Sequence, residues 1–122
     1  MLQIHRIGPS RYSNTRSRIV IHQGIATTVA TATVKSDSLY EQSRDALANI
    51  DRHLEEVGVD KRQVLFVTIY LSEVKNKVAF NRAWDEWVDP DHLPLRACVG
   101  VELEDSDLVE LVVTAAVDEP AL

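Results

Sequence analysis

The segment Val64–Leu71 constrains the fold more than any other part of the sequence. It reads VLFVTIYL and is nearly continuously apolar, whereas a strand with one face in water alternates between apolar and polar residues. The pattern therefore predicts a central strand that is covered on both faces. The rest of a 122-residue chain has to supply that cover or leave it to a partner.

Two amphipathic helices are predicted. Residues 38–41 have the spacing of a capping box, which starts a helix, and Gly58 suits the position just after its end. A second helix carries an apolar stripe from Phe80 to Val88 and stops before Pro90. Two helices cover only one face of a sheet. We therefore expect something outside the chain, most simply further copies arranged with cyclic symmetry, to bury the other face.

The remaining segments complete an α+β sandwich. Further β-rich segments are residues 4–7, 18–21, 25–30, 97–103 and 108–117. Gln23-Gly24 predicts a hairpin turn, although residues 22–24 also fit the interior of a strand. Apart from the short segment 4–7, which fits an edge strand, the expected order is β-β-α-β-α-β-β. No linker or repeat interrupts the sequence, so residues 1–122 are expected to form one domain.

Charge and composition disfavour several classes of function. The net charge of −6 argues against nucleic acid as a partner, because phosphate binding needs a basic patch. The basic residues are dispersed, apart from a loose group of Arg11, Arg16 and Arg18. A single cysteine excludes an internal disulfide, and the four histidines lack metal-ligand spacings. With no signal-peptide or membrane-spanning pattern, we expect a soluble cytoplasmic protein that needs no membrane.

Two charged residues fit poorly in a purely structural interpretation. Arg96 opens an apolar strand directly after Pro94 and Leu95, and a guanidinium there suits a planar anion such as a carboxylate. Glu110 interrupts an apolar run, where a carboxylate is costly to bury unless it is paired or used. Because a short turn joins their strands, we expect the strands to be neighbours, so the ends that bear the two residues need not be far apart. A structural Arg–Glu salt bridge would explain the pair equally well.

Other candidates have structural explanations. Cys98 follows Arg96 by two residues, so both side chains point to the same face of a strand. A nucleophilic cysteine needs a base beside it, and we expect Cys98 to be a small residue next to a pocket instead. Trp84 and Trp87, at helical spacing, are expected to pack in the core. The sequence contains no glycine-rich phosphate-binding motif.

Taken together, these features resemble the RidA/YjgF family of reactive-intermediate deaminases, and within it the YoaB-like branch. The resemblance covers almost the whole chain. The segments that carry it are Tyr12-Ser13, residues 41–44, Asn49-Ile50, residues 67–71, the helix containing Asn81, residues 83–90 and residues 94–99.

The resemblance implies a chorismate-mutase-like fold and a homotrimer with clefts between its subunits. It also implies cofactor-free hydrolysis of reactive 2-imino acids, such as 2-iminopropanoate or 2-iminobutanoate, to 2-oxo acids and ammonia. Carried over to this sequence, Arg96 matches the arginine that pairs with the substrate carboxylate. Glu110 matches the acidic residue that handles water and protons, if one residue is deleted in the turn before it. Asn81 and Tyr12 match residues that line the cleft.

One motif departs from the family pattern. The family commonly has Ser-Gly-Gln, an apolar residue and proline at the second strand of the hairpin, whereas this chain has His-Gln-Gly-Ile-Ala at residues 22–26. Gln23 falls where the serine would be. The departure leaves open a second function, a non-catalytic module that binds a carboxylate metabolite in the same cleft. Nucleic-acid cleavage, which has been attached to some relatives, is disfavoured by the net charge.

Overall fold

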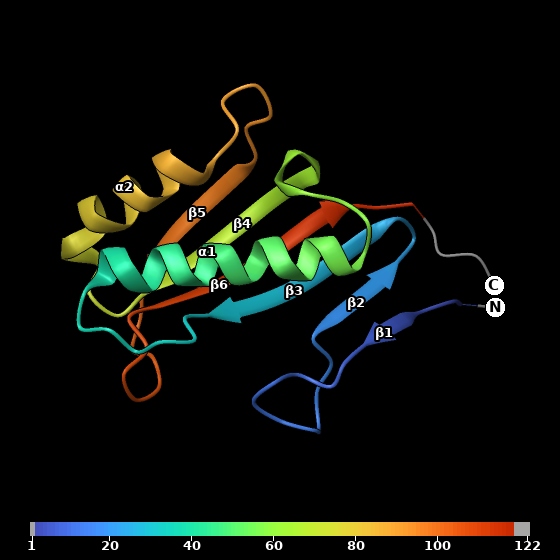
Figure 1. Cartoon of the computed structure of the whole chain (residues 1–122), viewed down its shortest axis with the longest axis horizontal. Coiled ribbons are helices and arrows are strands. Elements are labelled where there is room, and N and C mark those ends of the chain that lie inside the picture. The colour runs from blue at the N-terminus through green and yellow to red at the C-terminus, as the bar shows by residue number, and fades with distance from the viewer. Residues whose placement is uncertain (1, 119–122) are drawn as a thin grey trace.

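The protein is represented by a computed structural model that describes residues 2–118. One mixed sheet carries two helices on one of its faces (Figure 1). The helices are α1 (Leu39–Glu56) and α2 (Lys77–Trp87), and short 3-10 turns lie at Lys61–Gln63 and Val74–Asn76. The strands are β1 (His5–Ile7), β2 (Ile19–His22), β3 (Ile25–Thr31), β4 (Val64–Leu71), β5 (Leu95–Gly100) and β6 (Val109–Ala116). They confirm the expected α+β architecture, including the short edge strand at the N-terminus.

The first helix begins and ends where the sequence predicts. The Ser38 hydroxyl accepts a hydrogen bond from the Glu41 backbone N–H at 3.2 Å, which satisfies one of the free donors of the first turn. Past the other end, Gly58 has a φ of +78°, a left-handed conformation that glycine adopts without a steric penalty. Within the described chain, neither helix is both long and apolar enough to cross a bilayer.

The main core lies between the helices and the sheet. Phe80 of α2 is fully buried, as are Ile50 of α1, Ile69 of β4 and Leu111 of β6. Trp84 and Trp87 also belong to this cluster, which confirms their expected packing role. Burying a large apolar side chain contributes about 1.5–3 kcal/mol, so this layer fixes α2 against the sheet.

The strands that carry Arg96 and Glu110 are not neighbours, and the prediction that they pair was wrong. The sheet order is β1-β2-β3-β6-β4-β5, so β4 lies between β6 and β5. The cause is the α2 connection, which returns the chain beside β4 as a parallel strand. The following loop then crosses the end of β4, where Val101 and Leu108 bond to Leu71 and Ser72. β6 therefore joins the other edge of β4.

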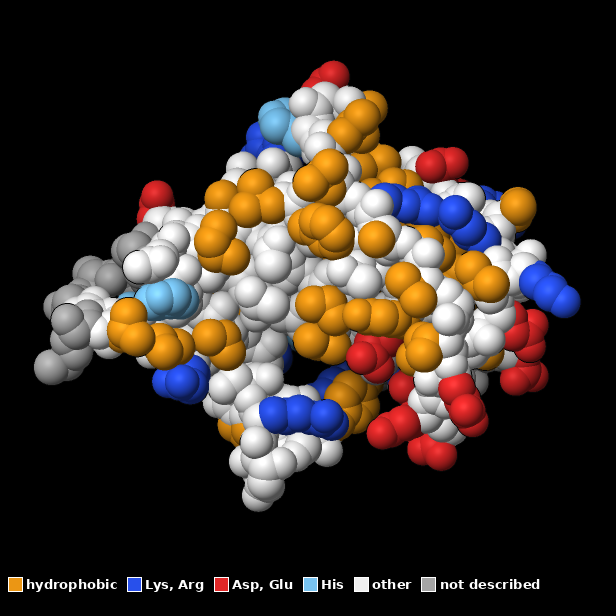
Figure 2. Space-filling view, turned by 180° about the vertical axis from the view of Figure 1, so that it is seen from behind, with side chains coloured by type: hydrophobic (Ala, Val, Ile, Leu, Met, Phe, Trp, Pro, Cys, Tyr) orange, Lys and Arg blue, Asp and Glu red, His pale blue; other side chains and the backbone are white. Residues whose placement is uncertain are grey.

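The sheet face opposite the helices is open in the described chain. Its exposed apolar side chains include Ile25, Val29, Phe66, Leu95 and Val99. Figure 2 shows this face, with hydrophobic side chains spread across the sheet. The sequence expectation that the chain's own helices leave one face uncovered is thus confirmed for residues 2–118.

Candidate functional site

Arg96 lies at the edge of the sheet, beneath α2. It pairs in register with Val67, which is fully buried under the helices, so the Arg96 side chain points to the helix side. Its Nη2 donates to the Asn81 side-chain oxygen at 2.7 Å. The guanidinium carbon also lies 5.5 Å from the Phe80 ring centroid and 5.1 Å from that of Trp84. Asn81 and the two rings therefore hold the guanidinium in a partly apolar surrounding.

Arg96 makes no ion pair among the described residues. The intrachain Arg–Glu salt bridge considered from the sequence is thus not formed there. Cys98 lies two residues further along β5, on the same side as Arg96, and packs partly buried against the core. We call Arg96, Asn81 and Cys98 the arginine half-site.

Glu110 lies on the opposite side of the sheet. Its neighbours Val109 and Leu111 are buried under the helices, so the Glu110 side chain points to the open face. It is flanked by Thr31 on β3 and Tyr70 on β4. Partial burial raises the pKa of the Glu110 carboxyl, and the nearby charges of the 104–107 turn raise it further.

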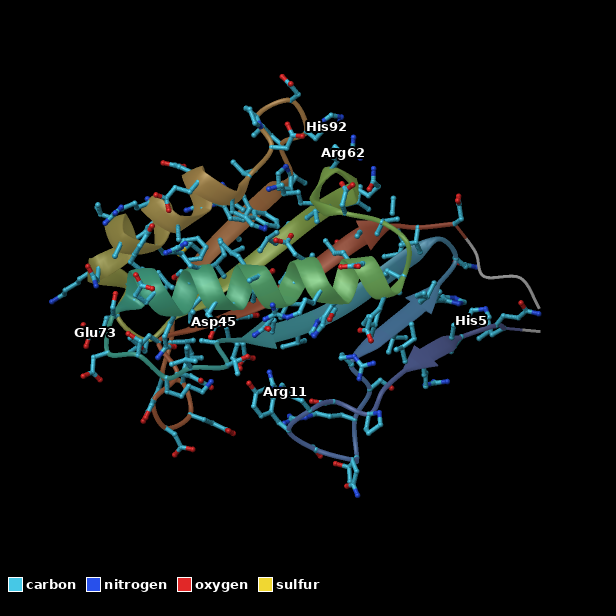
Figure 3. The ribbon with its side chains drawn as sticks, in the orientation of Figure 1. His5, Arg11, Asp45, Arg62, Glu73 and His92 are labelled. Carbon is cyan, nitrogen blue, oxygen red and sulfur yellow. The ribbon has the colours of Figure 1, made fainter. Side chains whose placement is uncertain are left out.

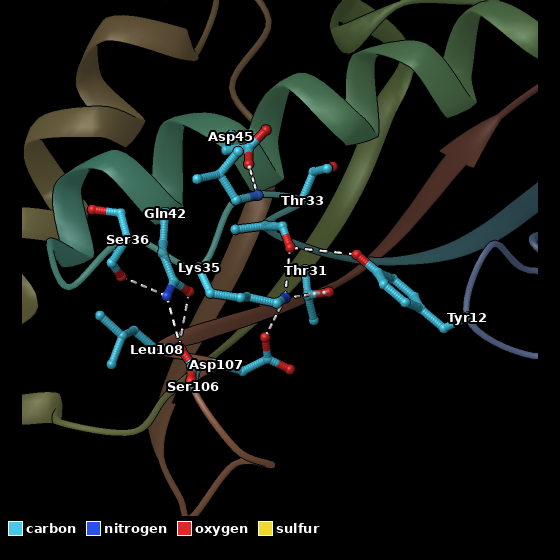
Figure 4. Close-up of polar contacts among 12 residues, drawn as sticks. Tyr12, Thr31, Thr33, Lys35, Ser36, Gln42, Asp45, Ser106, Asp107 and Leu108 are labelled. Carbon is cyan, nitrogen blue, oxygen red and sulfur yellow. Dashed lines mark hydrogen bonds and ion pairs between the residues drawn. The ribbon is translucent and has the colours of Figure 1, made fainter.

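Tyr12 reaches the same region from the loop between β1 and β2. Its hydroxyl donates to the Ala32 carbonyl oxygen at 3.3 Å (Figure 4). The Lys35 ammonium lies 5.7 Å from the Tyr12 ring centroid, donates to the same carbonyl at 2.5 Å and pairs with Asp107. Lys35 thus ties the end of β3 to the turn that leads into β6. We call Tyr12, Lys35 and Glu110 the glutamate half-site.

An open groove runs along the glutamate half-site. It has a volume of about 1470 Å³ and lies between the β1–β2 loop, α1, the end of β3 and the 102–107 turn. Tyr12, Lys35 and Glu110 all line it, whereas Arg96 does not. Figure 2 shows the hollow, with basic side chains on one side and acidic side chains on the other.

One chain therefore carries two separate half-sites. Arg96 and Glu110 lie on opposite faces of the sheet, with β4 between their strands. A substrate of three or four carbons is too short to touch both within one chain. The groups can meet at one ligand only if the arginine half-site comes from another copy.

Gln23 belongs to neither half-site. It occupies the β2–β3 turn with a φ of +50°, so the predicted hairpin is confirmed. The turn precedes β3, whereas Tyr12 and Glu110 lie near the opposite end of that strand. Thr31 lies six positions after Ile25, or roughly 20 Å of extended chain. Within one chain, Gln23 is therefore remote from Tyr12 and Glu110.

Sequence reasoning missed Thr31, Lys35 and Tyr70. Thr31 and Tyr70 flank Glu110 only because of the strand order, which the short β5–β6 connection concealed. Lys35 lies in a loop and carried no motif. Within residues 2–118, no group of three or more potential ligand side chains could hold a metal ion.

Comparisons with known proteins agree with this architecture. The family model described as Endoribonuclease L-PSP matches residues 6–117. A RutC family protein from Haemophilus ducreyi is 36% identical over 108 residues, covering 87% of this chain and 92% of the relative. The RutC family protein YoaB from Escherichia coli K12 is 34% identical over 102 residues, covering 83% and 90%.

Solved structures give the same result. A member of the YjgF protein family from Neisseria meningitidis superposes with a TM-score of 0.86 at 32% identity, covering 97% of this chain and 98% of that one. The match confirms the chorismate-mutase-like fold that the sequence resemblance implied.

Proposed function

The chain belongs to the RidA/YjgF family, whose family model is described as Endoribonuclease L-PSP, and from this premise we propose that it hydrolyses reactive 2-imino acids. The proposed substrates are small, such as 2-iminopropanoate or 2-iminobutanoate, and the products are a 2-oxo acid and ammonia. We place the reaction in clefts between the subunits of a homotrimer. No cofactor takes part.

The observation that carries the proposal is the state of Arg96. Its guanidinium is held by the Asn81 amide oxygen and by two aromatic rings, yet it has no carboxylate partner among the described residues. A guanidinium fixed in this way retains a pair of N–H groups for the two oxygens of a substrate carboxylate. Hydrogen bonds to charged groups contribute about 1.5–3 kcal/mol each. Arg96 would thereby fix the orientation of the imine.

Glu110 suits the chemical step. The imine carbon is already electrophilic, so a positioned water needs only a base to accept its proton as it adds. The nitrogen takes up a proton, and the resulting carbinolamine collapses to the 2-oxo acid as ammonia leaves. A positioned general base of this kind contributes about 10²- to 10⁴-fold. No covalent nucleophile is required.

The separation of the half-sites supports a cleft built from two copies. One copy would supply Arg96, Asn81 and Cys98, and its neighbour would supply Tyr12 and Glu110. The open sheet face offers the means, because a broad exposed apolar surface favours association in water. A closed ring of identical copies buries the same surface on every copy.

The test is release of ammonia from freshly generated imino acid, comparing native protein with Arg96→Ala. The matched control is Arg62→Ala, because Arg62 is exposed, belongs to neither half-site and has Asp60 as its ion-pair partner among the described residues (Figure 3). We expect Arg96→Ala to lose the acceleration and Arg62→Ala to keep it. Equal rates for native protein and Arg96→Ala, with the assembly intact, would refute the proposal.

Binding without turnover is the second candidate function. It is favoured by the position of Gln23, because the residue matched to the family's serine lies outside both half-sites. This function predicts saturable binding of 2-oxo acids that Arg96→Ala abolishes, with no ammonia release above the uncatalysed rate.

A further inference from the structure

Two arginines in the groove are held by neutral side chains within residues 2–118. Arg11 donates from Nη1 to the Thr33 hydroxyl at 2.7 Å, and the Asn49 amide donates to the same oxygen at 3.1 Å. The Asn49 amide oxygen in turn accepts a hydrogen bond from Arg52. One continuous chain of hydrogen bonds therefore links two guanidinium groups that both line the groove. We call Arg11 and Arg52 the arginine pair.

The arginine pair has no carboxylate partner among the described residues. Of the other basic residues that line the groove, Arg18 and Lys35 differ in this respect, whereas Arg16 also makes no ion pair among the described residues. Arg18 makes a two-pronged contact with Glu56 at 2.8 and 2.7 Å, and Lys35 pairs with Asp107. The charges of Arg18 and Lys35 are thus locally compensated, whereas those of the arginine pair are available to a ligand.

The arginine pair also acts electrostatically on a neighbouring histidine. His53 of α1 also lines the groove. Burial is the main cause that lowers the pKa of its ring. Glu56 raises this pKa, and the charges of Arg18, Arg52 and Arg11 lower it further. Figure 3 shows Arg11 extending from the β1–β2 loop toward α1.

The arginine pair is fixed relative to Glu110. Asn49 is 6% exposed, and its amide also donates to the Thr31 carbonyl oxygen at 2.8 Å. Thr31 is the strand partner of Glu110, and such partners have Cα atoms about 4.5–5.5 Å apart. The hydrogen-bonded chain therefore starts at the backbone of the residue that pairs with Glu110 and runs through Asn49 to both arginines.

The groove is larger than a three- or four-carbon imino acid requires. Its volume of about 1470 Å³ exceeds even the usual range of small-molecule pockets, roughly 300–1000 Å³. Part of this space would be taken by a neighbouring copy. The arginine pair lines this space, and its two guanidinium groups suit an anionic group of the ligand.

We propose that the arginine pair binds a second carboxylate of the substrate, so that the preferred substrate is a 2-imino dicarboxylic acid. The inference rests on the proposed function, because it assigns the first carboxylate to Arg96 of a neighbouring copy. Glu110 lies at the imine carbon between the two ends. The reaction is unchanged: water adds to the C=N carbon, the nitrogen is protonated, and ammonia leaves.

The test compares freshly generated imines of a dicarboxylic and a monocarboxylic amino acid, glutamate and 2-aminobutanoate. We expect kcat/KM to be about tenfold higher for the dicarboxylic imine, the effect of one additional charged hydrogen-bonding contact. Arg11→Gln and Arg52→Gln should each lower the dicarboxylic value at least five times more than the monocarboxylic one. Arg44→Gln is the matched control, because Arg44 lies on α1 outside the groove.

A binding measurement separates failure of this inference from failure of the proposed function. Titration calorimetry with 2-oxoglutarate and with 2-oxobutanoate requires no turnover. Tighter binding of the dicarboxylate, reduced in Arg52→Gln but not in Arg44→Gln, supports the inference even if neither imine is hydrolysed. Equal affinity for the two oxo acids, or binding of inorganic phosphate but not of 2-oxoglutarate, overturns it.

Discussion

Arg96 and Glu110 belong to one sheet but face opposite sides of it, with β4 between their strands. Different elements position the two side chains. The Asn81 amide under α2 holds Arg96, whereas Glu110 lies beside the end of β3 and the turn before β6. This arrangement makes the proposed cleft a property of the assembly, which can be tested directly.

Mixing two inactive variants should restore activity. A mixture of Arg96→Ala and Glu110→Gln chains contains clefts in which one copy supplies the native arginine and the other the native glutamate. For random assembly of equal amounts, we expect about a quarter of native ammonia release. The measurement uses chains unfolded and refolded together, and the control is each variant refolded alone. Activity no greater than that of the separate variants would contradict a shared cleft.

The rate of imine hydrolysis should fall at acid pH, and this fall should depend on Glu110. Burial raises the pKa of this carboxyl above its ordinary value of 4.5, and a general base works only when deprotonated. The rate constant kcat/KM should therefore fall as pH drops through that raised pKa. Glu110→Gln should lower kcat/KM by about 10²- to 10⁴-fold and remove the acid limb.

The control for this profile is Glu73→Gln, an exposed carboxylate away from the groove. It should keep the native acid limb. The same linkage predicts a gain in stability for Glu110→Gln at pH 7, because a raised carboxyl pKa means that the folded state favours the protonated form. An unshifted melting temperature together with an unchanged acid limb would show that Glu110 does not titrate as described.

His53 should make folding sensitive to mild acid. Its Nδ1 lies 2.7 Å from the Thr28 hydroxyl, which itself donates to the Arg18 carbonyl, so His53 is the donor. Burial lowers the pKa of His53 below 6.5, so the unfolded chain binds the proton first as pH falls. Stability from this group is therefore lost as pH drops through 6.5 toward the lower folded pKa.

The measurement is thermal unfolding at pH 7.5 and 5.5 for native protein and His53→Gln. Native protein should lose more stability between these two pH values than the variant does, and the variant should be the less stable of the two at pH 7.5. His92→Gln, on an exposed loop, serves as the control. Identical acid losses in native protein and His53→Gln would count against the prediction.

Gln42 should be among the most sensitive polar positions. This fully buried side chain donates to the Ser36 and Ser106 carbonyl oxygens, each at 2.8 Å, and accepts from the Leu108 N–H at 3.0 Å (Figure 4). Gln42→Leu leaves these buried backbone groups without partners, which costs about 2–4 kcal/mol of unfolding free energy. Denaturant unfolding measures the loss.

Gln3→Leu is the control, because Gln3 is exposed near the N-terminus. Gln42 also anchors the turn that leads into β6, so its loss should lower kcat by loosening the support of Glu110. A Gln42→Leu protein as stable as Gln3→Leu would show that the bonded turn contributes little.

Local patterns predicted the helices well. Ser38 and Gly58 act within a few residues of their own positions, through a side-chain cap and a left-handed backbone. The α2 stripe is equally local, because helical spacing alone determines which residues share a face. The two-sided apolar pattern of β4 likewise correctly indicated a sheet face that the helices do not cover.

Strand order could not be read from connection length. The loop between β5 and β6 is short, but it crosses the end of β4 instead of forming a hairpin. The helical connection from β4 to β5 was the better indicator, since such a crossover places parallel strands side by side. Thr31 and Tyr70 were missed for this reason, because their position beside Glu110 depends on register.

Because the sheet has an open apolar face, the activity per chain should depend on the concentration of the protein. If further copies provide its cover, a chain that meets too few others loses both its buried surface and its complete cleft. Expression level would then set activity more steeply than in proportion, since halving the number of chains also shifts the balance toward isolated ones. A lower concentration alone would then abolish the activity, without degradation or modification of the chain.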